Sequence, residues 1–426
     1  MIRTTRTVGV LLAAALLAAA CTEGGAGTPA PGTQAPATDA PTTVAPGTEA
    51  PMTEAPGTEA PGTEAPGTEA PGTEAPGTEA PSGEYTIGFS NPLGVGNGFR
   101  EEQLCTAKAQ ALVSGQVTAG TWIHRNTDAA GQLSDIRDLV AAGVDAIVFN
   151  PLDPEALNPA LDEAQAAGIT TVAIDAYVTD PETYNLSNDQ VAYGRIGAEW
   201  LFEQLGGEGR VWYTRGIIGH PADNDRHQGV MEALESYPNI ELYPSQDGVG
   251  TNWDPATATQ LANDLIASGE YANIDGIWTS GMDSQVVDAI QASGQPFVPI
   301  VGADLRAFVE QLLNVSGNYE GLQGIAVYNP AAVGGAGVEL ALRALNGEQI
   351  DSETRTLQDS SGNPVDIEAV FLPEPLAYDN VTEEGRAGLE EINVPELDAL
   401  WPVSWQIEGW TDYSFEEMQA CAGPGE

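Results

Sequence analysis

From Tyr85 onward, short apolar runs alternate with segments of helical periodicity, and this alternation constrains the fold more than any other feature. The apolar runs are residues 85–90, 121–124, 146–149 and 171–174, followed by a second series at 211–213, 240–243, 276–278, 299–302 and 324–328. Strands that alternate with helices across short connections indicate parallel sheets covered by helices on both faces. We therefore predict an α/β fold of two doubly wound parallel-sheet lobes, joined by a hinge, with a ligand in the cleft between them.

The amino-terminal residues 1–20 have the composition of an export signal. Arg3 and Arg6 precede an apolar run from Val8 that is too short to span a bilayer, which predicts a signal peptide. The signal ends in LLAAAC, which resembles the lipobox of bacterial lipoproteins, although Ala18 stands where a leucine is usual. We expect Cys21 to be lipidated; an ordinary cleaved signal with an incidental cysteine is the alternative.

Residues 21–83 form a low-complexity segment dominated by Pro, Gly, Thr, Glu and Ala, with PGTEA repeated between Pro46 and Ala80. Such a composition cannot form a hydrophobic core. Proline stiffness and repulsion between the regularly spaced glutamates predict an extended tether. A tether of this kind would hold a folded body away from a lipid anchor, so we expect an extracytoplasmic protein attached to the cell membrane.

The charge balance excludes one class of partner. The net charge is −48, from 14 basic and 62 acidic residues, so binding to nucleic acid phosphates is not expected. The acidic excess is consistent with an anionic pocket for cationic ligands, or with solvation in a salty or crowded exterior.

Two cysteines remain in the folded part, Cys105 and Cys421, and we expect them to pair in an exported protein. The tail from Phe371 onward contains Trp401, Trp405, Trp410 and Tyr413, and we expect it to pack on the first lobe.

Polar and aromatic side chains follow the ends of the predicted strands, where ligands of such sheets bind. These residues are Asn97, Phe99, Asp175, Tyr177, His220, Arg226, Trp253, Ser280, Asp283, Asp304, Tyr328 and Asn329. A sugar needs both donors and acceptors for its hydroxyls and rings for its C–H faces, so the set predicts a sugar site. Individually, an aspartate after a strand can be a helix cap and Trp253 can be a core residue.

Four segments carry a resemblance to a known family. They are RNTDAAGQLSDIRDLVAAGVDAIVFNPLDPEAL (125–157), GIIGHPADNDRHQGV (216–230), VGAD (301–304) and YNPAAVGGAGVELALRALNG (328–347). Over about residues 85–350 the chain resembles the ribose-, glucose- and galactose-binding proteins of bacterial ABC transporters, which have the type I periplasmic binding fold. The resemblance implies lobes at 84–188 with 329–350 and at 189–328. Residues 351–426 would be a final hinge crossing and an additional tail.

The resemblance also implies residue roles. Phe99 and Trp253 would sandwich the sugar ring, and Asn97 and Asp304 would contact hydroxyls. His220 and Arg226 match the hexose-binding members, whereas ribose-type members carry an arginine where Asn224 stands. Tyr328 replaces an amide side chain, and Asp175 and Tyr177 follow a strand where members carry Asp-Arg or an Asn. These departures favour a ligand other than plain ribose.

The implied function is capture of a sugar or polyol by a monomer that delivers it to an ABC transporter permease. A sensor that presents a sugar or nucleoside to a signalling partner would use the same pocket. No cofactor or metal site is predicted, because the cysteine and histidine spacings do not suggest zinc.

A catalytic role is the alternative class. The glycine-rich loop at Gly94 and Gly96 departs from the dinucleotide fingerprint because Phe99 replaces the third glycine. Asp175 and Asp304 could mimic a glycosidase carboxylate pair, although no nucleophile motif accompanies the histidines.

Overall fold

The structure is a computed structural model, and it describes residues 84–93, 95–359 and 361–426. The predicted signal peptide, the tether and Cys21 lie outside the described residues, so those assignments stay predictions.

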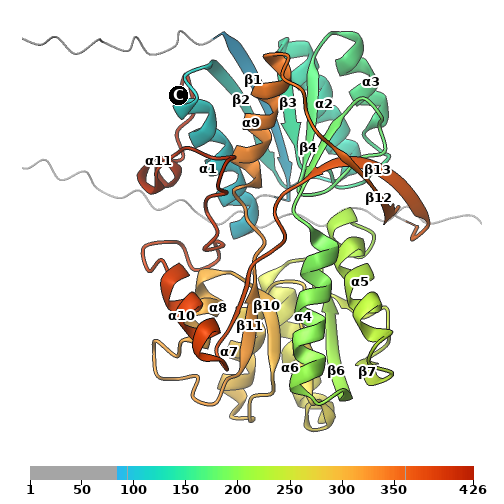
Figure 1. Ribbon diagram of the computed structural model, residues 1–426, viewed down its shortest axis with the longest axis vertical. Helices are drawn as coiled ribbons and strands as arrows, with labels where there is room; N and C mark the ends of the chain where they lie inside the picture. The colour runs from blue at the N-terminus through green and yellow to red at the C-terminus, as the bar shows by residue number, and fades with distance from the viewer. Residues whose placement is uncertain (1–83, 94, 360) are drawn as a thin grey trace, which may run out of the picture. The chain divides into compact units, whose positions relative to one another are not determined.

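The first lobe is built on a sheet with the strand order β12-β13-β5-β4-β3-β1-β2. Its strands are β1 (Tyr85–Pro92), β2 (Val117–Arg125), β3 (Ala146–Phe149), β4 (Thr170–Ile174), β5 (Tyr184–Ser187), β12 (Glu353–Gln358) and β13 (Pro364–Phe371). Its helices are α1 (Gly98–Val113), α2 (Ala129–Ala142), α3 (Asn158–Ala166) and α9 (Val333–Leu345). Helices α1 and α9 pack together on one side of this sheet, and α2 and α3 pack together on the other (Figure 1).

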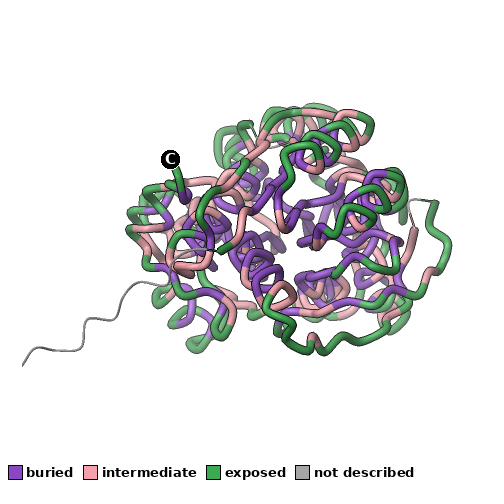
Figure 2. Tube along the Cα trace, turned by 90° about the horizontal axis from the view of Figure 1, so that it is seen from above, coloured by how far each residue is buried: buried purple, intermediate pink, exposed green. Residues whose placement is uncertain are grey.

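The core of the first lobe follows from the alternation of side chains along its strands. On β3, Ala146 and Val148 join the cluster that α1 and α9 complete, whereas Ile147 and Phe149 join the cluster of α2 and α3. Successive residues of a strand point to opposite faces, so a strand covered on both faces is apolar throughout. Figure 2 shows the resulting buried segments in the interior and the exposed ones at the periphery.

The second lobe has a sheet with the order β14-β11-β10-β9-β6-β7, and β8 pairs with β6. Its strands are β6 (Glu208–Arg215), β7 (Asn239–Tyr243), β8 (Val249–Gly250), β9 (Gly276–Trp278), β10 (Ile300–Ala303), β11 (Gly324–Val327) and β14 (Ala377–Asp379). Its helices are α4 (Gln190–Gln204), α5 (Pro221–Leu234), α6 (Pro255–Ser268), the 3-10 helix η1 (Glu270–Asn273), α7 (Asp283–Ser293), α8 (Arg306–Leu312) and α10 (Glu383–Ile392). Helices α4 and α5 contribute to one core cluster and α6 to α8 to another.

The predicted two-lobe α/β class is confirmed, with one refinement. Every predicted strand overlaps a strand of the structure, and β5, β8 and β12 to β14 are additional. The sheets are mixed rather than purely parallel, because β12 pairs antiparallel with β13 and β14 pairs antiparallel with β11.

The tail beyond residue 371 packs on both lobes, so the expectation that it packs on the first lobe was incomplete. Strand β14 and helix α10 lie on the second lobe, whereas α11 (Phe415–Ala420) packs against α1 of the first. Trp401 and Trp405 join a hydrophobic cluster that contains much of the second lobe's core and also Ala109 of α1, and Trp410 joins the first lobe's cluster. The tail aromatics are thus divided between two apolar surfaces.

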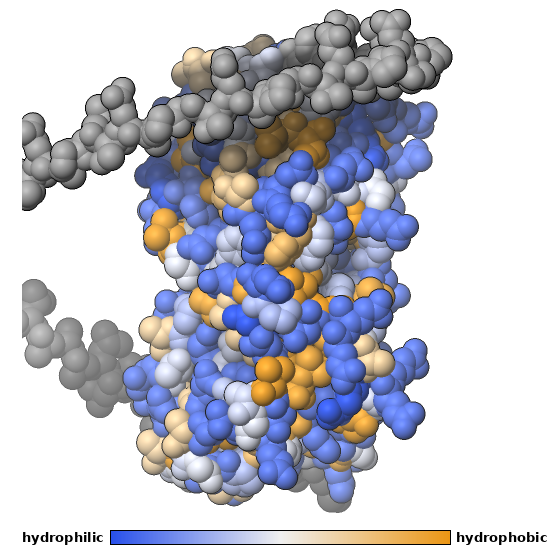
Figure 3. Space-filling model, turned by 90° about the vertical axis from the view of Figure 1, so that its left-hand side faces the viewer, coloured by the Kyte–Doolittle hydropathy of each residue, from blue (hydrophilic) through white to orange (hydrophobic). Residues whose placement is uncertain are grey.

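One face of the structure shows how hydrophilic and hydrophobic residues are distributed. Hydrophilic residues cover most of the face in Figure 3, and hydrophobic residues form small separated groups on it. Among the described residues, every helix is too short or too polar to cross a lipid bilayer.

Cys105 of α1 and Cys421, just beyond α11, form a disulfide with a sequence separation of 316. Cys105 is buried, and the bond closes nearly the whole described chain into one loop. Closing a loop of this length removes much of the conformational freedom of the unfolded chain.

Replacing both cysteines by serine is therefore expected to lower the free energy of unfolding by on the order of 5 kcal/mol, the value for a loop of this length in the chain-entropy model. Thermal unfolding of the oxidised parent and of the double variant measures the difference, and reductant should affect only the parent. Two free thiols in the purified unreduced protein, or equal unfolding temperatures, would contradict the assignment.

Candidate ligand-binding site

A cavity lies where the ends of strands from both lobes meet. Its lining includes Asn97, Phe99, Arg100 and Asp175 from the first lobe, Ala222, Arg226, Trp253, Ser280, Gly281, Met282, Ala303, Asp304 and Leu305 from the second, Asn329 after β11, and Pro402 from the tail. Most of these residues follow the carboxyl ends of strands, which is where the fold class places a ligand.

The loop before α1 positions Asn97 and Phe99 in the cavity lining. Gly96 adopts a positive φ of 85°, which glycine allows without a steric cost. The side chain of Asn97 then caps α1 by accepting from the Arg100 backbone N–H at 3.2 Å, and its Nδ2 donates to the Trp253 carbonyl of the other lobe at 3.4 Å. Phe99 is therefore held at the first turn of the helix, in the cavity wall.

Asp175 lies at the end of β4 in a left-handed conformation, with φ at 65°. Its Oδ1 accepts from Gln190 at 2.9 Å and Asn188 at 3.3 Å, and its Oδ2 accepts from Asn150 at 3.2 Å. A carboxylate offers about four acceptor positions, so these side chains leave room for about one further donor.

Asp304 is fully buried at the end of β10, and its carboxylate is similarly occupied. Oδ1 accepts from the Asn329 backbone N–H at 3.0 Å, and Oδ2 accepts from the Ser404 hydroxyl at 2.5 Å and the Ser404 backbone N–H at 3.2 Å. The alternative that Asp304 caps α8 is wrong, because the cap position is Leu305 and that helix start has no side-chain cap bond.

Arg226 is buried on α5 and lines the cavity. Its Nε donates to Gln190 at 2.7 Å and its Nη1 to the Ser280 carbonyl at 2.8 Å, while the group stacks 4.2 Å from the Tyr193 ring centroid. The nearby carboxylate of Asp223 pairs with Arg215 at 2.6 Å rather than with Arg226.

The buried side chain of Gln190 links these groups across the hinge. It donates to Asp175 of the first lobe and accepts from Arg226 of the second, so the two charges are connected through one neutral amide. Gln190 was not predicted as a site residue, because it follows β5, a strand that the sequence pattern did not indicate.

Arg100 is a second buried arginine in the lining that the sequence analysis missed. Its Nη1 lies 3.4 Å from Asn91 Oδ1 and its Nη2 lies 3.4 Å from His220 Nε2. Burial lowers the pKa of Arg100 to about 10, so the group stays charged at neutral pH. Its place one residue after Phe99, in the first turn of α1, was the signal available in the sequence.

Trp253 forms the opposite aromatic wall. Its Nε1 donates to the Ser280 carbonyl at 2.7 Å, and its ring meets the His220 ring edge-on at 5.1 Å. Gly216 allows this position, because a Cβ there would lie 2.0 Å from the indole ring. Trp253 is only partly buried, so it is not a core residue, and part of its ring can face a ligand.

Two other predicted site residues, His220 and Asn224, are not part of the lining and are bound to other protein groups. His220 caps α5 by accepting from the Ala222 backbone N–H, and burial followed by the charge of Arg100 lowers its pKa well below the usual range. Asn224 accepts from Arg215 and donates to the Asp359 carbonyl.

Tyr177, Asp283 and Tyr328 also lie away from the lining. Tyr177 donates its hydroxyl to the Gln358 carbonyl in the β12–β13 hairpin, and Tyr328 packs edge-on against Tyr378. Asp283 accepts from the Ala303 backbone N–H at 3.2 Å, and burial raises its pKa to about 7. Their roles in binding stay predictions that this geometry does not favour.

The site thus offers two guanidinium groups, two largely satisfied carboxylates and two aromatic residues. Within the described part of the chain, no group of three or more His, Cys, Asp or Glu side chains could hold a metal ion. A mixture of fixed donors and acceptors beside rings suits a compact, uncharged, polyhydroxylated molecule.

Comparisons with known proteins agree with this architecture. The "Periplasmic binding protein domain" family matches residues 87–349. The chain is 28% identical over 237 residues to the xylitol-binding protein of Mycolicibacterium smegmatis, covering 54% of this chain and 65% of that protein, slightly less than two thirds of its length. It is 24% identical to the ribose import binding protein of Escherichia coli, covering 53% of this chain and 73% of that protein.

A solved structure shows the same fold. The ABC transporter solute binding protein from Thermobispora bispora superposes with a TM-score of 0.61 at 20% identity, covering 79% of this chain and 94% of that one. Since the family match spans residues 87–349, more than half of the 426 residues, the chain belongs to the periplasmic binding protein domain family.

Proposed function

We propose that this protein is an extracytoplasmic solute-binding protein that captures an uncharged sugar or sugar-like polyol between its lobes and delivers it to an ABC importer. The observation that carries the proposal is the cavity itself, in which Phe99 and Trp253 stand on different lobes and Arg226, Asp175 and Asp304 supply donors and acceptors. The named relatives, which include xylitol- and ribose-binding proteins, support the ligand class.

We also infer that the protein binds its ligand without transforming it. Asp175 and Asp304 each accept hydrogen bonds from several protein donors, so little of either carboxylate is left to act on a ligand. The glycosidase alternative requires one of the two carboxyls to act as an acid. Formation of any product from a bound sugar would contradict this inference.

A thermal-shift screen over pentoses, hexoses, polyols and nucleosides tests the ligand class. A ligand at about a hundredfold its Kd should stabilise the protein by about 2.7 kcal/mol, which a melting experiment detects readily. We expect a sugar or polyol to raise the unfolding temperature. A protein that responds to no member of the panel at millimolar concentration, or only to nucleosides, would contradict the proposal.

The aromatic walls give a sharper prediction. Trp253→Ala should weaken binding of the best ligand by about 2–4 kcal/mol, the range of a buried aromatic anchor, because the ring no longer covers the ligand. Trp253→Phe should retain most of the affinity, and Trp200→Ala on α4, which is also half-buried but outside the cavity, should retain all of it. Isothermal calorimetry measures each constant, and equal affinities for the parent and Trp253→Ala would overturn the role of the ring.

The lipid anchor is proposed from the sequence LLAAAC alone. Cys21→Ser should abolish incorporation of labelled fatty acid and move the exported protein from the membrane fraction to the soluble fraction, since stable attachment needs the acyl chains. Fractionation and mass spectrometry of the mature amino terminus measure both effects. Unchanged membrane association of the variant would contradict lipidation at this residue.

A further inference from the structure

We propose that the C-terminal strap, residues 394–426, is a specificity-determining part of the ligand site, acting through Ser404 on the Asp304 carboxylate. The inference rests on the proposed function and extends it to a segment outside residues 87–349, where the family match lies. In this proposal Ser404 is a positioning residue, because it acts on the ligand through Asp304.

The strap is fixed to the second lobe beside the cavity. Arg306 and Ala307 donate their backbone N–H groups to the carbonyls of Trp401 and Ala399, both at 2.9 Å, and Val403 donates to the Asp304 carbonyl at 2.9 Å. These backbone bonds form a short antiparallel contact next to the end of β10.

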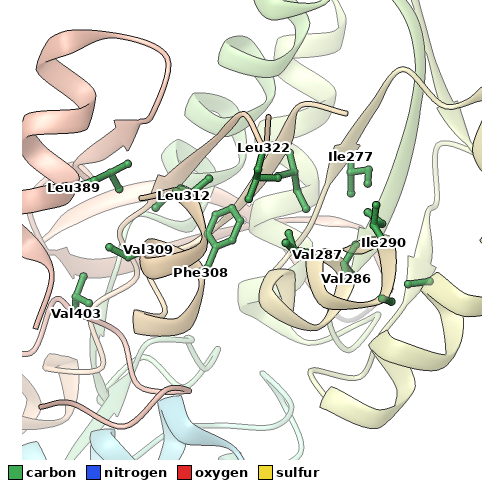
Figure 4. Close-up of a cluster of buried hydrophobic side chains, with 14 of the residues drawn as sticks. Ile277, Val286, Val287, Ile290, Phe308, Val309, Leu312, Leu322, Leu389 and Val403 are labelled. Carbon is green, nitrogen blue, oxygen red and sulfur yellow. The ribbon is translucent and has the colours of Figure 1, made fainter. Parts of the chain in front are cut away.

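Hydrophobic packing holds the same part of the strap. Val403 belongs to the second lobe's core cluster and is 5% exposed. In Figure 4 it lies on the same side of α8 as Val309, with Leu389 of α10 close by. The residue next to Ser404 is therefore a core residue, and the position of Ser404 is correspondingly well defined.

At the cavity, the strap contributes a wall and a pair of hydrogen bonds. Pro402 lines the cavity, and Ser404 supplies both a hydroxyl and a backbone N–H to Asp304 Oδ2. Together with the Asn329 N–H on Oδ1, these donors occupy all but about one of the roughly four acceptor positions of the carboxylate. The strap thereby limits which ligand hydroxyls Asp304 can receive, and from which direction.

The strap is also fixed to the first lobe. The Cys105–Cys421 disulfide joins it to α1, and Gln110 of α1 accepts from the Asp412 backbone N–H at 3.0 Å. Tyr413 and Met418, both fully buried, belong to the hydrophobic cluster of Val403, which also includes Ala109 of α1 in the first lobe.

The first turn of α1 also lies directly against the strap. A Cβ at Gly98 would be 2.2 Å from the Leu400 carbonyl oxygen, so glycine is needed for this approach. Gly98 follows Asn97 and precedes Phe99, so the strap touches the helix start that carries the first lobe's ligand-facing side chains. It therefore contacts both walls of the site.

Ligand selectivity is the readout that a merely structural strap would not change. We compare Ser404→Ala, Ser404→Thr and Ser414→Ala by calorimetry with xylitol, D-ribose and D-galactose as probes. Ser414 is a matched control, because its hydroxyl belongs to the same strap but caps α11. Ser404→Ala frees one acceptor position of a buried carboxylate, so the ratio of affinities between probes should change by about tenfold or more.

Ser404→Thr keeps the hydroxyl and should keep the parent ratio, as should Ser414→Ala. If Ser404→Ala also keeps the parent ratio, or if Ser414→Ala shifts it equally, Ser404 does not determine specificity and the inference fails.

A second measurement needs no ligand. Hydrogen exchange of the unliganded protein should show protected Val403 and Ser404 amides in the oxidised parent, and exchange about tenfold faster or more when Cys105 and Cys421 are both serine, because one anchor of the strap is lost. The amides of α7 serve as the internal reference. Equal protection of Val403 and Ser404 in the two proteins would overturn the anchoring role.

The two measurements separate this inference from the proposed function. If the parent binds none of the probes nor any sugar of the screen, the proposed function fails, and the exchange experiment still decides whether the strap is held against Asp304.

Discussion

The carboxylate of Asp304 is the point at which three separate segments of the chain meet. It lies at the end of β10, accepts from Asn329 at the hinge after β11, and accepts from Ser404 in the strap. A fully buried carboxylate without partners would be strongly destabilising, so these donors are needed for the fold as well as for the site. Burial still raises the pKa of Asp304 above its usual value, although its hydrogen bonds oppose that shift. Three segments are thus positioned by one group in the cavity wall.

A second buried network links the lobes through neutral amides. Gln190 connects Asp175 to Arg226, and Asn188 donates to Asn329 at 3.1 Å, so the hinge segments are joined by side chains that carry no charge. Because each guanidinium retains N–H groups that these bonds do not use, the network leaves donors for a ligand. The chain has a net charge of −48 and only 14 basic residues, and two of these, Arg100 and Arg226, line this cavity.

The sequence predicted the two-lobe class and much of the cavity lining for the same physical reason: parallel strands end at one edge, and residues after them face the cleft. Phe99, Asp175, Arg226, Trp253 and Asp304 follow that rule and line the cavity.

Some residues that were predicted to line the cavity do not, because a tertiary contact holds their side chains in another place. Tyr177 follows β4 but its hydroxyl is bound by the β12–β13 hairpin, which the sequence analysis did not predict. Asp283 faces the backbone of Ala303 instead of the cavity. Pro402 and Ser404 come from a tail more than 70 residues beyond Asn329 in sequence, and no local pattern indicates their return to the site.

A crystal structure with the tightest-binding sugar of the screen would test the central claim most directly. The sugar is expected between Phe99 and Trp253, with hydroxyls within hydrogen-bonding distance of Asp175, Asp304 and Arg226. A sugar bound outside this cavity, or one inside it that touches none of these charged groups, would contradict the assignment of the site.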